Sequence, residues 1–188
     1  MTFLDAPTIP PEVLQLWKEK QSSAFQEKIS ALSETEFQKD YLAQFFGGPS
    51  LASLKGLGPE HIDALLVKAH NELKAGSIPA ACDTLMLVMA LDPNEDRAVY
   101  TLASILQMKG CYYDAGLLYM RYIMLKAMEP RGYLRIGECL LGDDHIAEAR
   151  EYITGALSLA TEAGDTLTQQ QAKTMLSQLE QRDSAVAL

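Results

Sequence analysis

The chain is poor in cysteine, in basic residues and in long apolar runs. Its 188 residues include three cysteines, and 16 Lys and Arg stand against 25 Asp and Glu, giving a net charge of -9. Binding to nucleic acid requires clustered Lys and Arg that neutralise phosphates, and this chain has few. The longest apolar run, residues 85–91, is far shorter than the roughly 20 residues of a membrane-spanning helix. We therefore expect no nucleic-acid partner and no stable membrane insertion.

The cysteines and the N-terminal residues indicate a protein that stays in the cytoplasm. Cys82, Cys111 and Cys139 form no CxxC pair and have no histidine at metal-ligand spacing, so we expect small buried apolar residues at all three positions. No Lys or Arg precedes Lys18, whereas a secretory signal peptide begins with a basic region.

No catalytic or metal-binding motif is recognisable. His61, His70 and His145 lie far apart, and none belongs to an HExxH motif or accompanies a nucleophile. The segment Asp143-Asp144-His145 falls between two expected helices, where turn chemistry explains it. We therefore predict that the chain is not an enzyme and has no metal site and no cofactor.

An internal repeat of 34 residues organises most of the chain. The residues that match at this spacing are Ala69, Ala103 and Gly137, then Ala81, Ala115 and Ala149, then Leu85, Tyr119 and Ile153, with Gly76 and Gly110. Thirty-four residues is the length of a tetratricopeptide helix-turn-helix unit, and these residue types fit its pattern. The sequence thus predicts an all-α fold with three tandem tetratricopeptide (TPR) repeats in a short right-handed solenoid.

The predicted organisation has three parts. Residues 1–58 form an N-terminal helical arm, residues 59–163 hold the repeats (62–95, 96–129 and 130–163), and residues 164–188 form a C-terminal capping helix with a frayed tail. Gly76 and Gly110 serve the turns inside the first two repeats, because glycine adopts positive φ without strain. Gly58-Pro59 starts a helix, and Asp165 or Thr166 caps the final one, which runs to about Gln181.

The arm carries its own apolar stripe. Over residues 11–31 a helical period aligns Val13, Trp17, Phe25 and Ile29 on one face. A second helix is expected over residues 34–46, with Ser33 and Glu36 as its capping box.

The first helix of each repeat is expected to line a concave groove. The predicted groove residues are Leu66, His70, Leu73, Arg97, Tyr100, Ser104, Gln107, Met108, Arg131, Leu134, Glu138 and Leu141. Their alternation of apolar and polar side chains suits an extended peptide, and Arg97 and Arg131 are expected to face Asp63 and Glu138. Several of these side chains could instead pack against neighbouring helices. Leu66 and His70 stand where a carboxylate clamp needs Lys and Asn, so we expect no such clamp.

The order of an N-terminal arm, three TPR repeats and a capping helix resembles the class II chaperones of bacterial type III secretion, which bind translocator proteins. The matching segments are Gly-Gly-Pro-Ser-Leu-Ala-Ser-Leu at 47–54, Met-Glu-Pro-Arg at 128–131, Gly-Glu-Cys-Leu-Leu at 137–141 and Ala-Glu-Ala at 147–149. The resemblance extends over about residues 37–179. Members of this family commonly have tyrosines in the groove of the first repeat, where this chain has Leu66, His70 and Leu73.

The resemblance implies a chaperone of the bacterial cytoplasm that keeps pore-forming translocators soluble and separate before export. It implies that a proline-containing extended segment of the translocator binds in the groove. It also implies a homodimer formed through the N-terminal helices, which here carry Val13, Trp17, Phe25 and Ile29. A general TPR scaffold that assembles other cytoplasmic proteins is the alternative, and the identity of the co-purifying protein distinguishes the two.

Overall fold

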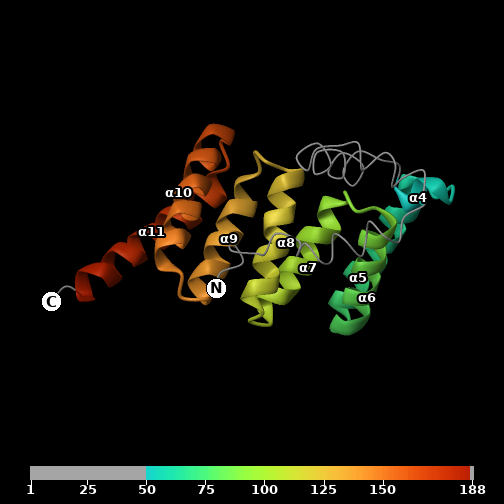
Figure 1. Ribbon diagram of the computed structural model, residues 1–188, viewed down its shortest axis with the longest axis horizontal. Coiled ribbons are helices and arrows are strands. Elements are labelled where there is room, and N and C mark those ends of the chain that lie inside the picture. Colours follow the sequence, from blue (N-terminus) through green and yellow to red (C-terminus); the bar gives the residue numbers. More distant parts are fainter. Residues whose placement is uncertain (1–49, 187–188) are drawn as a thin grey trace, which may run out of the picture.

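The computed structural model describes residues 50–186, which form a row of helices with no strand in that range (Figure 1). The helices are α4 (Leu51–Leu54), α5 (Pro59–Lys74), α6 (Ile78–Leu91), α7 (Asp96–Met108), α8 (Tyr112–Leu125), α9 (Pro130–Gly142), α10 (Ile146–Ala163) and α11 (Thr166–Val186). The predicted all-α fold is therefore confirmed. The expected helices at 11–31 and 34–46, and with them Val13, Trp17, Phe25 and Ile29, lie outside the described residues.

Helices α5 to α10 form three antiparallel pairs that repeat along the chain. The second helices of the pairs begin at Ile78, Tyr112 and Ile146, and α7 and α9 begin at Asp96 and Pro130, so each start recurs after 34 residues. From α5 to α11 each helix packs on the next helix along the chain, α11 also packs on α9, and α4 contacts α6. In Figure 1 the pairs lie side by side along the long axis and α11 leaves the row at its C-terminal end.

Small residues permit close packing within each pair. Ala69 and Ala103 on the first helices are 1% and 0% exposed, and Ala81 and Ala115 on the second helices are fully buried. In the third pair a methyl group on Gly137 would lie 2.5 Å from Ile153 Cγ1, so α9 and α10 approach too closely even for alanine. The matching positions of the repeat are thus the positions where the helices touch.

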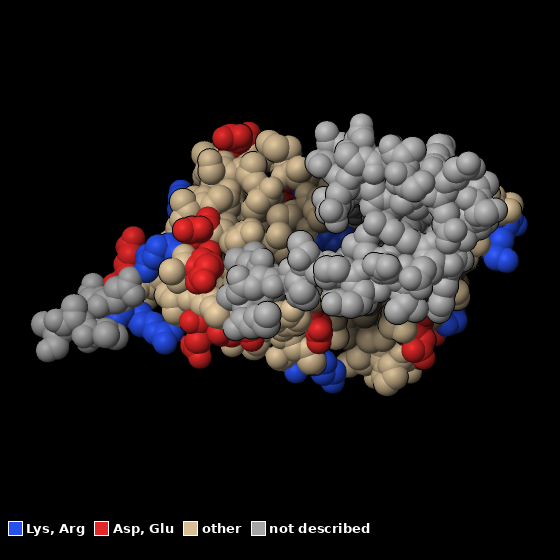
Figure 2. All heavy atoms as spheres, in the orientation of Figure 1, with Lys and Arg blue, Asp and Glu red and all other residues tan. Residues whose placement is uncertain are grey.

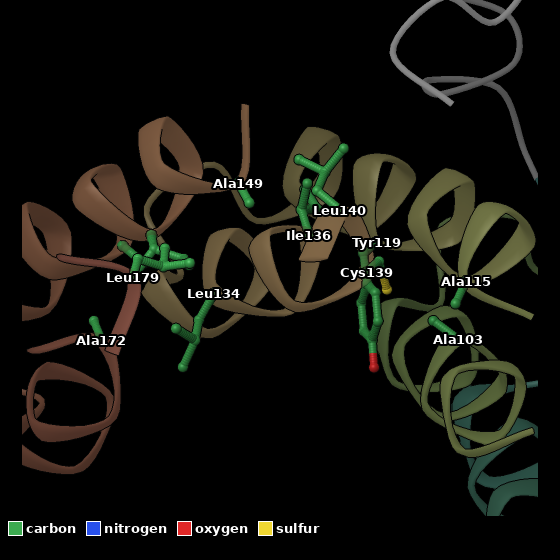
Figure 3. Packing of buried hydrophobic residues seen from close by; sticks show 12 residues of the cluster. Ala103, Ala115, Tyr119, Leu134, Ile136, Cys139, Leu140, Ala149, Ala172 and Leu179 are labelled. Atoms are coloured by element: carbon green, nitrogen blue, oxygen red, sulfur yellow. The ribbon is translucent and has the colours of Figure 1, made fainter. Parts of the chain in front are cut away.

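The buried side chains form two clusters along the row. One cluster joins α4 to α7 and includes Leu85, Val88 and Ile105. The other joins α7 to α11 and includes Tyr119 and Ile153 (Figure 3). Because Leu118 packs against both clusters, the helices share a continuous interior, as expected of stacked repeats that cannot bury their apolar faces alone.

The turn inside each pair needs one residue with positive φ. Gly76 and Gly110 have φ of 75° and 76°, as the sequence predicts. The equivalent residue of the third pair is Asp144, with φ 61°, the one positive-φ residue other than glycine among residues 50–186. Aspartate tolerates this region better than most residues but less well than glycine. The segment Asp143-Asp144-His145 is therefore a turn.

The first residues of α4, α5 and α11 show why these helices begin where they do. Pro59 is the first residue of α5, as predicted. Before it, the Ser50 hydroxyl accepts a hydrogen bond from the Ser53 amide (3.1 Å) and starts the short helix α4, which the sequence pattern did not indicate. Asp165 caps α11, since its carboxylate accepts the amide (3.1 Å) and hydroxyl (2.6 Å) hydrogen bonds of Thr168.

Helix α11 is longer than predicted. It continues to Val186 instead of ending near Gln181, because no glycine or proline interrupts residues 166–186. None of the helices in the described part of the chain combines the length and apolar character needed to cross a membrane.

The expectation that all three cysteines are buried is wrong for two of them. Cys139 is buried in α9, but Cys82 is half-buried and Cys111 is exposed. Cys111 follows the turn glycine Gly110 and precedes the first residue of α8, so it lies outside the packed helix faces.

The turn geometry makes a testable prediction about stability. Replacing Asp144 with glycine removes the strain of a side chain at positive φ, so Asp144→Gly should raise the free energy of unfolding by about 0.5 to 1 kcal/mol in urea titrations. The reciprocal change Gly110→Asp should lower it by a similar amount, because a Cβ atom there meets nothing within 4 Å and only the backbone is strained. Equal effects of the same sign from the two variants would contradict this account.

Candidate functional site

The first helices of the three pairs present the predicted groove residues, and the structure sorts these residues by exposure. The exposed ones are His70, Arg97, Met108 and Arg131. The half-buried ones are Leu66, Leu73, Tyr100, Ser104, Gln107, Glu138 and Leu141. The side chains available to a ligand are therefore mixed in polarity.

Leu134 must be removed from this set. Its side chain is 2% exposed and belongs to the buried cluster that joins α7 to α11. Figure 3 shows Leu134 on the same side of α9 as the Tyr119 hydroxyl, with Ile136 and Leu140 on the opposite side. A buried leucine stabilises the fold and offers no open contact, so the prediction that Leu134 lines the groove is wrong.

The other apolar groove residues are anchored in the core and remain partly open. Leu66 and Leu73 of α5 pack against the cluster formed by α4 to α7. Tyr100 of α7 and Leu141 of α9 pack against the second cluster. Because one side of each residue is fixed and the other is accessible, these residues offer preformed apolar surface along the groove.

A network of hydrogen bonds among the predicted groove residues connects α7, α8 and α9. The Tyr119 hydroxyl lies 2.9 Å from Ser104 Oγ and donates to Gln107 Oε1 (2.9 Å). Gln107 Nε2 donates to Glu138 Oε2 (2.6 Å), which also accepts from Arg135 Nη1 (2.6 Å). These bonds fix the orientation of the Gln107 amide, so its carbonyl and its NH₂ group each have a defined direction.

Packed tyrosine rings lie next to these hydrogen-bonded side chains. The Tyr119 ring is fully buried, and burial raises the pKa of its hydroxyl well above the ordinary value, so the hydroxyl remains a donor. The Tyr100 ring packs against Tyr119 and Tyr122 with centroid distances of 5.4 and 4.9 Å. Burial likewise raises the pKa of Tyr122 to about 12. The polar centre of the groove therefore rests on a rigid aromatic layer.

Arg135 completes the chain and was missed by sequence reasoning. Its Nε donates to the Tyr100 hydroxyl (3.3 Å), and its side chain is 37% exposed. Burial acts to lower the pKa of Arg135, but the hydrogen bonds to Tyr100 and Glu138 outweigh burial and raise it. The opposite charges of Arg135 and Glu138, three residues apart on one helix, were the available signal.

The remaining arginines of the groove side are paired at its rim. Arg97 contacts Glu95 (2.7 Å) and Asp63 (2.8 Å), and its hydrogen bond lowers the pKa of Glu95. Arg131 was expected to face Glu138 but instead donates to Glu129 (2.8 Å), two residues before it. The charges thus balance locally, and Figure 2 shows acidic and basic side chains interspersed over the visible C-terminal part.

The side chains around the predicted groove include a cysteine, Cys139, and several carboxylates. Burial is the main cause that raises the pKa of the Cys139 thiol to about 12, so this sulfur remains a protonated core atom. Among residues 50–186, no group of three or more His, Cys, Asp or Glu side chains is placed to hold a metal ion. What the described residues offer is a row of preformed apolar surface interrupted by oriented donors and acceptors, which suits an extended peptide.

The hydrogen-bond chain predicts a cost for losing one hydroxyl. Tyr119→Phe keeps the buried ring but leaves Gln107 Oε1 without its donor, so the free energy of unfolding should fall by about 1 to 2 kcal/mol in urea titrations. Tyr113→Phe is the matched control, because the Tyr113 side chain is exposed, and it should change stability by only a few tenths of a kcal/mol. Indistinguishable free energies of unfolding for the two variants would show that the hydrogen bonds of Tyr119 contribute nothing to stability.

Comparison with known proteins identifies the fold. No protein-family model matches the chain, and no curated protein matches it in sequence. SycD, the type III secretion translocator chaperone of Yersinia enterocolitica, is 24% identical and has a TM-score of 0.64, covering 70% of this chain and 98% of SycD. A T3SS complex from Aeromonas hydrophila matches at TM-score 0.69 with 23% identity, covering 78% of this chain and 98% of the other.

PcrH of Pseudomonas aeruginosa, in complex with the chaperone binding region of PopD, matches at TM-score 0.63 with 23% identity. The match covers 68% of this chain and 97% of PcrH. These likenesses confirm the predicted TPR-type helical solenoid and show that this chain has the fold of the type III secretion translocator chaperones.

Proposed function

We propose that this chain is a non-enzymatic chaperone of a bacterial type III secretion system. In the bacterial cytoplasm it binds an extended segment of a translocator, the client, and keeps that client soluble and separate before export. The observation that carries the proposal is the groove side of α5, α7 and α9, where half-buried apolar side chains flank an oriented polar centre, in a chain with the fold of SycD and PcrH.

The structural neighbours support the choice of client. PcrH has been crystallised with the chaperone binding regions of PopD and PopB, and SycD with a peptide of the translocator YopD. The present groove offers such a segment apolar contacts from Leu66, Leu73, Tyr100 and Leu141. Its polar centre supplies partners for main-chain amides, which would otherwise lose their hydrogen bonds to water.

Physical considerations explain why a translocator needs such a partner. A protein destined for a membrane exposes long apolar segments in water, and these segments associate with one another. An extended proline-containing segment is partly ordered before it binds, which lowers the entropy lost in the complex. The net charge of -9 keeps the chaperone itself soluble while it carries an apolar client.

Co-expression with the translocator encoded near this chain tests the proposal. The wild-type chain should co-purify with the translocator, and His70→Glu combined with Met108→Glu should reduce binding about tenfold, since both exposed side chains lie on groove helices. Met86→Glu with Leu87→Glu on α6 is the matched control and should bind normally. A soluble multi-protein assembly that lacks any membrane-active protein would instead favour a general TPR scaffold.

We also propose that the chain forms a homodimer through the apolar stripe of residues 11–31. SycD of Yersinia enterocolitica forms an alternative dimer in one of its crystal structures. Because Trp17 and Phe25 belong to the stripe, Trp17→Glu with Phe25→Glu should give a folded monomer by light scattering, with unchanged helix content. An unchanged mass would mean that the stripe covers the first repeat of the same chain.

A further inference from the structure

A cavity lies between α9 and α11, at the C-terminal end of the groove. Its volume is about 380 Å³, and it is lined by Glu138, Leu167, Gln170, Gln171, Thr174 and Met175. This space is large enough for a long side chain together with part of the main chain that carries it. Helix α11 packs on both α10 and α9, so the cavity is a feature of the folded helix stack.

The lining combines apolar walls with hydrogen-bond acceptors. Leu167 is 64% exposed and Met175 is half-buried, so both present apolar surface. The Thr174 hydroxyl donates its proton to the Gln170 carbonyl (2.9 Å), which leaves lone pairs on Thr174 Oγ1 as acceptors. The side-chain amides of Gln170 and Gln171 add two carbonyl oxygens.

Glu138 is the only charged residue of the lining. Both of its hydrogen bonds, from Gln107 and Arg135, end on Oε2, and within the described residues Oε1 receives no hydrogen bond. The Glu138 side chain is 22% exposed, and Oε1 still has lone pairs to offer. A half-buried carboxylate oxygen of this kind gains most from a donor that carries positive charge.

We propose that this cavity binds a lysine or arginine side chain of the client segment, which extends the groove beyond the third helix pair onto α11. The inference rests on the proposed function. The aliphatic stem of the basic side chain lies along Leu167 and Met175, and its charged head donates to Glu138 Oε1 and to the carbonyl oxygens of Gln170 and Gln171. An acidic side chain in the same place would bring two carboxylates together, which is unfavourable.

Glu138 connects this cavity to the centre of the groove. The same carboxylate belongs to the hydrogen-bond network that includes Ser104, and it also lines the space beside α11. A segment that lies along α7 and α9 and passes Glu138 therefore reaches α11 without leaving the surface. The basic residue should stand at a fixed spacing from the apolar residues that fill the groove.

Selection from a random peptide library displayed on phage tests the inference with the full chain. The wild-type protein should enrich peptides with Lys or Arg at one spacing from the apolar anchors. Gln171→Lys places a cation beside Glu138 and should remove the preference for the basic residue while the apolar anchors are still selected. Gln178→Lys is the matched control, because this exposed residue of α11 does not line the cavity, and it should select as the wild type does.

Affinities of one selected peptide make the test quantitative. Replacing its basic residue with norleucine should weaken binding to the wild type about tenfold and leave binding to Gln171→Lys nearly unchanged. Peptides with apolar anchors but no basic preference, or an equal loss for both proteins, would overturn the inference and leave the proposed function standing. If no peptide is enriched and no translocator co-purifies, both proposals are wrong.

Discussion

Close contact between the two helices of each pair is the constraint on which the rest of the structure depends. Neither helix can bury its apolar face alone, and only small residues at Ala69, Ala103 and Gly137 let the partner helix approach closely enough. Once the pairs form, the 34-residue spacing stacks them and turns the first helices toward one side. The surface formed by the first helices is therefore a consequence of helix packing and needs no separate structural element.

Tyr119 shows how this packing also builds the binding surface. The other repeats have Leu85 and Ile153 at its position, and all three side chains are buried to within 1%. Only Tyr119 carries a polar atom to the far end of the side chain, where it meets Ser104 and Gln107 on α7. A core residue thus determines the direction of the Gln107 amide, and the rigidity of the core passes to the surface beside it.

The repeat spacing predicted the helices and the turn glycines, because these features depend on local sequence. The sequence pattern did not indicate whether a groove residue is open. Leu134 is buried where Tyr100 is partly accessible, since their surroundings come from helices far along the chain. Arg135 was missed for a similar reason, because its partner Tyr100 lies 35 residues away and only the fold brings them together.

The hydrogen-bond chain limits how the specificity of this protein can diverge. If the proposed function holds, a substitution at Gln107 that adapts the protein to another client also removes one hydrogen-bond acceptor of the buried Tyr119 hydroxyl, so such a change lowers the stability of the fold. The exposed residues His70 and Gln171 carry no such penalty. Substitutions at exposed positions of this kind can therefore accumulate freely, whereas the residues joined by the Tyr119 hydroxyl are held together by the stability of the fold.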